Sequence, residues 1–189
     1  MDNLQTGDII LFSGNCNVSK AIKLLTWSKY SHVGMVINDD PNYDFPLLYE
    51  STHNDSIKGL DVGKCTQGVQ VVPLKERIDQ YKGTVAIRRV INPCYRFRHQ
   101  LRLYRTEMKG VPFEQSTIEL LSSTQLFACF RGKSDLTSVF CSEHQAESFM
   151  ALGWMCRCRP SNYFTPKFFA VNNTYLNGVS FGEIEVLKS

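Results

Sequence analysis

The chain has 189 residues, of which 43% are hydrophobic and 21% are charged, and its formal net charge is +3 at pH 7. This balance is typical of one globular domain with a substantial core, and it excludes disordered, collagen-like and coiled-coil chains. The charge is too small for a dedicated nucleic-acid binder, so we do not expect nucleic acid as a partner. No stretch reaches the roughly 20 apolar residues that cross a bilayer, so we expect no transmembrane segment.

The chain contains seven cysteines, and its N-terminus lacks the basic start and apolar run of a secretory signal. We therefore expect reduced thiols in a cytoplasmic, reducing compartment, with at least one cysteine retained for its reactivity. Cys156 and Cys158 are separated by one residue, whereas the cysteine pairs of zinc sites are separated by two to four. We expect no metal and no organic cofactor.

Short apolar runs separated by turn signals dominate the first half of the chain. They predict strands over residues 7–12, 31–37, 46–50, 68–73 and 83–90. Asn17 is placed to cap a helix that ends near Ser28. The apolar face of this helix consists of Val18, Ala21, Ile22 and Leu25. Residues 51–67 predict a polar loop, and residues 74–81 predict a short helical segment.

Helical periodicity dominates the second half, where a helix is predicted to begin at Asn92-Pro93. Its apolar stripe consists of Phe97, Leu101, Tyr104 and Met108. A further helix is predicted over 138–152 and a strand over 181–187, whereas residues 110–137 show only a short helix near 117–121. Strands thus precede helices, which is typical of the α+β class.

A basic stripe lies opposite the apolar stripe of the helix after Asn92-Pro93, and it consists of Arg98, Arg102, Arg105 and Lys109. It is a candidate site for an anionic ligand such as a phosphate, an anionic lipid headgroup or an acidic partner. A solvated helix face is the simpler interpretation. The corresponding function hypothesis is an adaptor for nucleic acid or an anionic membrane, whose binding would weaken steeply with salt.

Cys141, at the start of the predicted helix 138–152, is the best candidate for a nucleophile. The free N–H groups and the dipole at a helix start favour the negative charge of a thiolate. The same N–H groups can hold the oxyanion of a tetrahedral intermediate. A cysteine in this position is by itself more often inert, and Cys16, before the first helix, is the rival thiol.

His32 is the best candidate for the base that activates this thiol. It opens the strand 31–37, so a stiff backbone fixes its ring near the rim of the sheet. A lone histidine on a strand is usually structural, so its role depends on its neighbours. The alternatives are His53 in a polar loop, His99 among arginines, and His144 on the helix of Cys141.

Glu50 ends the strand that follows that of His32. If the two strands pair, its carboxylate can accept a hydrogen bond from the far ring nitrogen and stabilise the imidazolium. Without that pairing, Glu50 would be a solvated carboxylate at a strand end. Cys141, His32 and Glu50 would together supply the three roles of cysteine-dependent acyl transfer.

Four segments carry these features in order, and they are Leu4–Phe12, Ser31–Ile37, Leu48–Glu50 and Phe140–Glu143. Their order and spacing resemble the circularly permuted NlpC-type papain-like proteins. That superfamily includes bacterial cell-wall endopeptidases and amidases, lecithin–retinol-type acyltransferases, and members in large DNA viruses such as poxviruses. In its unpermuted members the cysteine helix precedes the strands. The resemblance covers roughly residues 4–165, including the proline-containing stretch Pro160–Pro166.

The resemblance implies one papain-like α+β domain over residues 1–189, with a core at about 4–165 and a C-terminal extension over 166–189. An antiparallel sheet would pack against the helix that bears the nucleophile. The resemblance matches Cys141 to the nucleophile, His32 to the base and Glu50 to the polar third residue. The implied activity is that of a thiol protease, amidase or acyltransferase, acting on a peptide or lipid amide or ester.

The chain departs from the family pattern at the loop 51–67 and at the basic helix 95–109, so the family's substrates do not carry over. It also lacks the hydrophobic C-terminal anchor of the mammalian acyltransferases. The competing hypothesis is a catalytically silent binding or structural protein of the same fold, such as a viral protein of the virion. A virion-associated location is the corresponding expectation.

Overall fold

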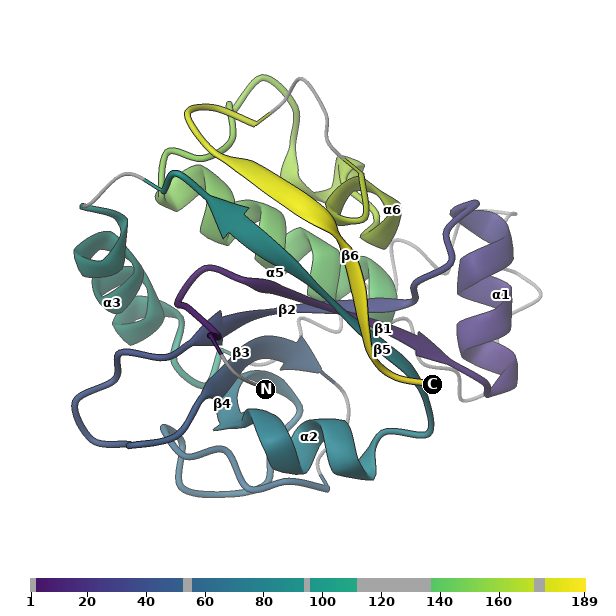
Figure 1. The fold of residues 1–189 in the computed structure, drawn as a ribbon, viewed down its shortest axis with the longest axis horizontal. Coiled ribbons are helices and arrows are strands. Elements are labelled where there is room, and N and C mark those ends of the chain that lie inside the picture. Colours follow the sequence, from purple (N-terminus) through teal and green to yellow (C-terminus); the bar gives the residue numbers. More distant parts are fainter. Residues whose placement is uncertain (1–2, 53–55, 94–95, 112–136, 172–175) are drawn as a thin grey trace.

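One antiparallel sheet is the centre of the molecule, and the computed structural model describes all residues except 1–2, 53–55, 94–95, 112–136 and 172–175 (Figure 1). Within these described residues the sheet has six strands, in the order β4-β3-β2-β1-β5-β6. They are β1 (Ile9–Gly14), β2 (His32–Ile37), β3 (Leu47–Thr52), β4 (Gly68–Pro73), β5 (Gly83–Ile91) and β6 (Ser180–Lys188). The predicted α+β class with an antiparallel sheet is confirmed.

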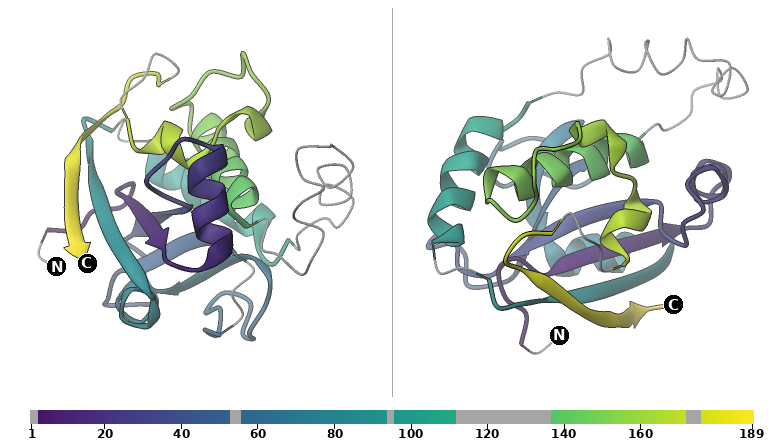
Figure 2. Two further views of the ribbon diagram at one scale, coloured as in Figure 1. Left: turned by 90° about the vertical axis from the view of Figure 1, so that its right-hand side faces the viewer. Right: turned by 90° about the horizontal axis from the view of Figure 1, so that it is seen from above.

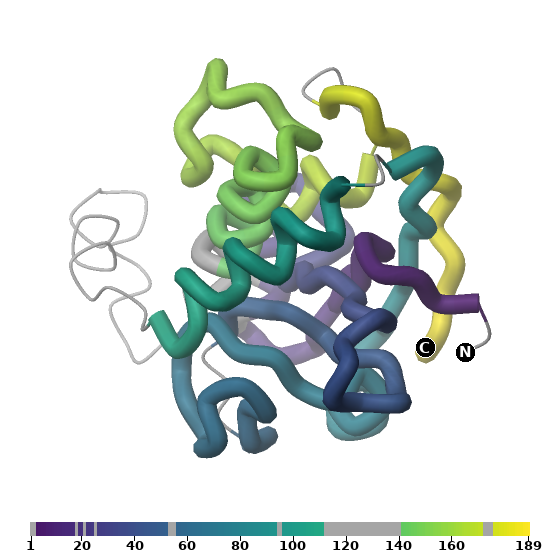
Figure 3. Tube along the Cα trace, turned by 90° about the vertical axis from the view of Figure 1, so that its left-hand side faces the viewer, coloured from purple at the N-terminus to yellow at the C-terminus, as the bar shows by residue number. Residues whose placement is uncertain are grey.

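Helices cover both faces of this sheet (Figures 1 and 2). The helices are α1 (Asn17–Leu25), α2 (Leu74–Gln80), α3 (Phe97–Met108), α5 (Thr137–Ala151) and α6 (Pro166–Phe169), with a 3-10 turn at Ser161–Tyr163. Figure 3 shows α3 running beside α5 on one face. The opposite face is covered by α2, whose Leu74 and Ile78 share a buried cluster with Phe12.

Burial on both faces explains why the strand sequences read as continuous apolar runs. Every residue of β2 and of β3 is buried. The two strands pair antiparallel, with Val36 opposite Leu48. Because side chains alternate along a strand, this register puts His32 and Glu50 on the same face of the sheet, the face covered by α2.

The C-terminal segment belongs to the core rather than extending from it. β6 pairs with β5 and completes the sheet. Phe169 and Phe181 join the same buried cluster as Phe149 of α5, and the rings of Phe149 and Phe181 stack at 5.6 Å. The buried Arg88 guanidinium donates to the carbonyls of Phe169 and Phe181 at 3.0 and 3.1 Å. The boundary expected at residue 165 therefore does not separate a core from an extension.

Helix boundaries differ from the expectations at two places. α3 begins at Phe97 rather than at Asn92, because Asn92 has a φ of 53°, which no residue inside a right-handed helix adopts. α1 ends at Leu25 rather than near Ser28. The short helix expected near residues 117–121 lies outside the described residues, as do the side chains of Val18, Ala21, Leu25 and residues 137–140.

Gly34, in the middle of β2, lets β2 and β3 approach closely. A Cβ at this position would lie 2.8 Å from Leu48 Cδ1 and 3.1 Å from the Tyr49 carbonyl oxygen. Leu48 is itself fully buried, so its side chain has no free space into which to move. At Gly182 of β6 the nearest atom to such a Cβ is 3.8 Å away, which is an ordinary contact.

We therefore expect Gly34→Ala to lower the free energy of unfolding by about 1–3 kcal/mol, because it overpacks the junction of β2 and β3. The matched control Gly182→Ala should change it by less than about 0.5 kcal/mol. Urea unfolding of both variants measures the difference. Equal stability of the two variants would show that Gly34 is not needed for close strand packing.

Candidate active site

His32, the first residue of β2, is buried and hydrogen-bonded to a carboxylate. Its ring packs against Phe12 with 5.2 Å between ring centroids. Its Nε2 lies 2.6 Å from Oε2 of Glu50 in β3. The sequence expectation that Glu50 would reach the imidazole if the two strands paired is therefore met by the geometry.

Glu50 is completely buried, and three side chains surround its carboxylate. Besides His32, Arg77 of α2 donates from Nε to Oε1 at 2.9 Å, and Gln70 of β4 donates from Nε2 to Oε1 at 3.4 Å. The Arg77 guanidinium lies over the rings of Phe12 and Tyr81, at 5.3 and 5.6 Å from their centroids. Such cation–π contacts stabilise a charge that has left water.

The electrostatics of this cluster keep Glu50 ionised. Burial raises the pKa of a carboxyl group, but the charge of Arg77 and the hydrogen bond and charge of His32 outweigh it. Together they lower the pKa of Glu50 to about 2. The carboxylate therefore remains negative at neutral pH, compensated by a buried guanidinium.

Cys141 of α5 lies beside His32, although 109 positions separate the two in the chain. Burial lowers the pKa of the imidazole, but the charge of Cys141, a hydrogen bond with it, and the hydrogen bond and charge of Glu50 outweigh burial. The net effect raises the pKa of His32 to about 9. Because Glu50 takes Nε2, the other ring nitrogen, Nδ1, is left for the sulfur.

The helix predicted over 138–152 is confirmed within one residue as α5, Thr137–Ala151. Cys141 is the fifth residue of α5, so the free N–H groups of the first turn belong to residues 137–140 and not to Cys141. Helical side chains tilt toward the N-terminus of their helix. This tilt directs the sulfur over the first turn, where the dipole still favours a negative charge.

Arg77, Gln70, Tyr81 and Ser31 are site residues that the sequence analysis missed. Tyr81 follows α2, and burial raises the pKa of its phenol to about 12. It lies within electrostatic range of Cys141. Its side chain hydrogen-bonds with Ser31. Arg77 had a signal in the sequence, because it precedes Ile78 and follows Leu74 by three, on the apolar face of the predicted helical segment 74–81.

The rival candidates lie elsewhere or have other roles. Cys16 is exposed and caps α1, where its sulfur accepts from the Ser19 N–H at 3.4 Å. His99 is exposed on α3, and His53 lies outside the described residues. His144 is buried, with Tyr49 packed edge-on at 4.8 Å and Tyr104 stacked at 6.3 Å.

His144 is held as a neutral ring. Neither ring nitrogen has a hydrogen-bond partner among the described residues. Burial lowers its pKa to about 4. A base must hold a proton during turnover, so the two buried histidines have opposite characters: His32 favours its charged form and His144 its neutral form.

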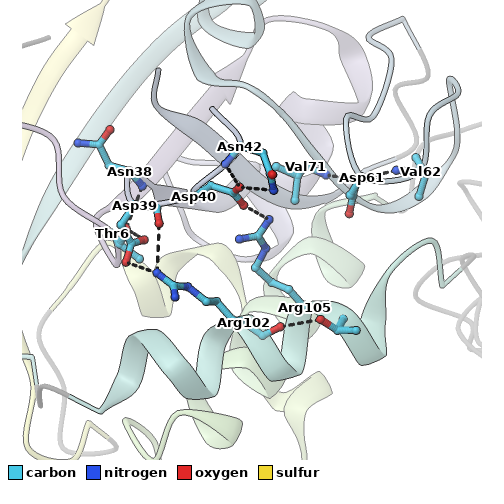
Figure 4. Close-up of polar contacts among 11 residues, drawn as sticks. Thr6, Asn38, Asp39, Asp40, Asn42, Asp61, Val62, Val71, Arg102 and Arg105 are labelled. Atoms are coloured by element: carbon cyan, nitrogen blue, oxygen red, sulfur yellow. Dashed lines mark hydrogen bonds and ion pairs between the residues drawn. The ribbon is translucent and has the colours of Figure 1, made fainter. Parts of the chain in front are cut away.

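The basic stripe of α3 contacts carboxylates of the same chain. Arg98 and Arg102 approach Asp39 Oδ2 at 3.7 and 3.5 Å, and Arg105 approaches Asp40 Oδ2 at 3.1 Å. Figure 4 shows Arg102 and Arg105 reaching from α3 to the turn after β2. Lys109 borders a polar pocket beside Arg105. These arginines dock α3 onto the turn, a structural role that the sequence analysis did not anticipate.

Three further observations concern the expected partners and thiols. Cys156 and Cys158 are joined by a disulfide, contrary to the expected reduced thiols, because a turn brings their Cα atoms to 5.4 Å, a separation that a bridge can span. Among the described residues, no His, Cys, Asp and Glu side chains form a group that could hold a metal ion. In the same part of the chain, no helix combines the length and apolar character needed to span a membrane.

Comparisons with known proteins give a distant structural match. No protein-family model matches the chain, and no curated protein matches it. Among solved structures, it is similar to the metalloprotein YiiX from Escherichia coli O157:H7, described as DUF1105, with 32% identity over 59% of this chain and a TM-score of 0.44. The matched part spans about half, 54%, of the length of YiiX.

The buried pair of Glu50 and Arg77 generates a stability prediction. Glu50→Gln should lower the free energy of unfolding by about 3–5 kcal/mol, because it leaves the guanidinium buried without its carboxylate. The double variant Glu50→Gln/Arg77→Met should recover most of that loss, because no buried charge is then left unpaired. Urea unfolding measures both. A single variant as stable as the parent chain would contradict the buried pair.

The neutral burial of His144 generates a pH prediction. Its pKa is about 4 in the folded chain against 6.5 for the free side chain, so the unfolded state binds more protons between these values. The free energy of unfolding should therefore decrease by up to about 3 kcal/mol as the pH falls from 6.5 to about 4. His144→Leu should flatten this dependence, whereas His99→Leu, on an exposed face, should not. Thermal unfolding against pH would reject the idea if both variants kept the original slope.

Proposed function

We propose that this protein is a cysteine-dependent hydrolase or acyltransferase with Cys141 as nucleophile, His32 as base and Glu50 as orienting carboxylate. The observation that carries the proposal is the buried series of contacts from Cys141 to His32 and from His32 to Glu50, the latter at 2.6 Å. Each residue supplies a role that the other two lack. The strongly shifted pKa values at one place are typical of functional sites.

The chemistry follows from the charges. The imidazolium form of His32 and the carboxylate form of Glu50 are favoured at neutral pH, because the pKa of His32 is raised to about 9 and that of Glu50 is lowered to about 2. The Cys141 thiolate attacks the carbonyl carbon of an amide or ester and forms a tetrahedral intermediate. N–H groups of the first turn of α5 can donate to its oxyanion.

His32 then moves the proton. The imidazolium gives its proton to the leaving amine or alcohol, and the carbon–heteroatom bond breaks to leave a thioester on Cys141. Water or another acceptor attacks the thioester, and His32 takes the proton of that acceptor. The thiolate leaves, and the site returns to its starting charges. Glu50 keeps the tautomer and orientation of the ring fixed throughout.

We extend the proposal to the fold family, the circularly permuted NlpC-type papain-like proteins. The packing of α5 against β2 and β3 supports it, as does the chain order in which the cysteine helix follows the strands of His32 and Glu50. A peptide and a lipid carbonyl both suit the chemistry, because a thiolate attacks either.

One observation favours a second candidate, a catalytically silent binding or structural protein of the same fold. The Cys141 residue is 1% exposed, so a substrate must displace neighbouring atoms before it reaches the sulfur. The two candidates differ in thiol reactivity, because an active site must admit an electrophile and a silent core residue need not.

Thiol labelling with iodoacetamide, a small electrophile, separates the candidates. At about pH 6, Cys141 should alkylate faster than the exposed Cys65, because His32 lies beside its sulfur and activates it. His32→Ala should slow Cys141 at least about tenfold without changing Cys65, and His99→Ala should change neither. Peptide mapping by mass spectrometry reads each site. Cys141 reacting more slowly than Cys65 at every pH would favour the silent protein.

A further inference from the structure

Helix α1 and the turn after it stand at the end of the sheet where the candidate site lies. The segment is inserted between Gly14, the last residue of β1, and His32, the first residue of β2. Figures 1 and 2 show α1 standing beyond the sheet rather than packed flat against either face. The N-cap residue of α1 is Cys16. It lies within electrostatic range of the phenol of Tyr81, a residue of the candidate site.

Two large apolar side chains on this element face water. Leu24 is 74% exposed and Trp27 is 83% exposed, the two highest values among the large hydrophobic residues that the structure describes. The Trp27 N–H donates to the Leu24 carbonyl at 3.3 Å, so the two residues bracket a single turn. Single exposed apolar residues are ordinary on a surface, whereas two highly exposed ones within one turn of a protruding element point to a contact.

The backbone of Trp27 strengthens this interpretation. Its φ is 49°, in the left-handed region, and it directly follows Thr26, the C-cap of α1. Glycine is the favoured residue at this place, because a bulky side chain is crowded in that conformation. An exposed ring gains the fold little burial in return for this crowding. Folding alone would therefore favour glycine here, so the fold does not account for the indole.

The charge of the segment is one-sided. Between Asp8 and Asp39 the sequence has three lysines and no acidic residue. Lys20 and Lys29 are exposed, while Lys23 donates from Nζ to the Gly14 carbonyl at 2.9 Å at the base of the helix. Tryptophan and leucine flanked by lysines are typical of elements that lie in a membrane interface.

We propose that residues 17–29 dock onto an anionic phospholipid surface. Trp27 and Leu24 enter the boundary between headgroups and acyl chains, and Lys20 and Lys29 contact the lipid phosphates and carboxylates. His32 follows Lys29 by three positions, so docking carries the candidate site to the lipid surface. The docking itself does not depend on catalysis.

The basic face of α3 is the matched contrast. Its three arginines already contact two carboxylates, those of Asp39 and Asp40, so its positive charge is partly compensated within the chain. Leu103 of α3 is 55% exposed and provides a control leucine on a helix that we do not expect to bind lipid.

Tryptophan fluorescence with vesicles tests the docking. Trp154, the second of the two tryptophans, is 2% exposed, so a change in emission reports on Trp27. With phosphatidylcholine vesicles that contain about a third phosphatidylserine, we expect co-sedimentation and a blue shift of the emission. Pure phosphatidylcholine or added salt should weaken both, because the lysine contribution is screened.

Variants of Trp27 and of the lysines distinguish their contributions to vesicle binding from effects on the stability of the fold. Trp27→Gly should weaken vesicle binding at least about tenfold without lowering the thermal midpoint, because glycine relieves the left-handed residue. Lys20→Gln and Lys29→Gln should each weaken binding about fivefold. Leu103→Ser should bind like the parent chain, and so should Cys141→Ala, which keeps this result independent of the proposed catalysis.

Three results would overturn the docking. The first is an emission spectrum that does not shift with anionic vesicles, and the second is unchanged binding by Trp27→Gly. The third is a lower thermal midpoint for Trp27→Gly, which would make the indole a folding residue. Binding to heparin, a soluble polyanion, without any response to vesicles would assign the segment to an acidic macromolecule instead of a lipid surface.

Discussion

The burial of the Glu50 carboxylate, which has no access to water, constrains where the surrounding elements lie. A buried charge is tolerated only where opposite charges and hydrogen bonds replace its lost hydration, and Glu50 receives both from Arg77 and His32. Those partners come from α2 and β2, so the placement of two further elements depends on this one side chain. The close approach of β2 and β3 at Gly34 holds the imidazole within reach of it.

The same arrangement determines what the site can do. Arg77 and Glu50 cancel one another, so the neighbouring thiol and imidazole can exist as a neutral pair or as an ion pair without changing the net charge of the buried cluster. Proton transfer between them therefore leaves no uncompensated charge in the interior. Glu50 biases the balance toward the ion pair, because its second oxygen stays hydrogen-bonded to the ring.

The sequence predicted the parts of this site that depend on local periodicity. His32 and Glu50 could be placed on adjacent strands because apolar runs and turn signals mark both strands, and the helix of Cys141 was recognisable from its pattern. The position of Arg77 on an apolar helix face indicated burial, but its partner lies 27 positions away, and no local pattern encodes a long-range ion pair. The docking of Arg105 onto Asp40 was missed for the same reason.

The contacts of His32 with Cys141 and Glu50 determine its protonation state. NMR of the ring nitrogens in the histidine-labelled protein measures this state directly. We expect both ring nitrogens of His32 to carry protons at neutral pH, and the ring to become neutral more readily when Cys141→Ala removes the neighbouring charge. His144 in the same spectrum should be neutral, which provides an internal reference. A neutral His32 ring at neutral pH, unchanged by loss of the thiol, would contradict the coupling of sulfur, imidazole and carboxylate.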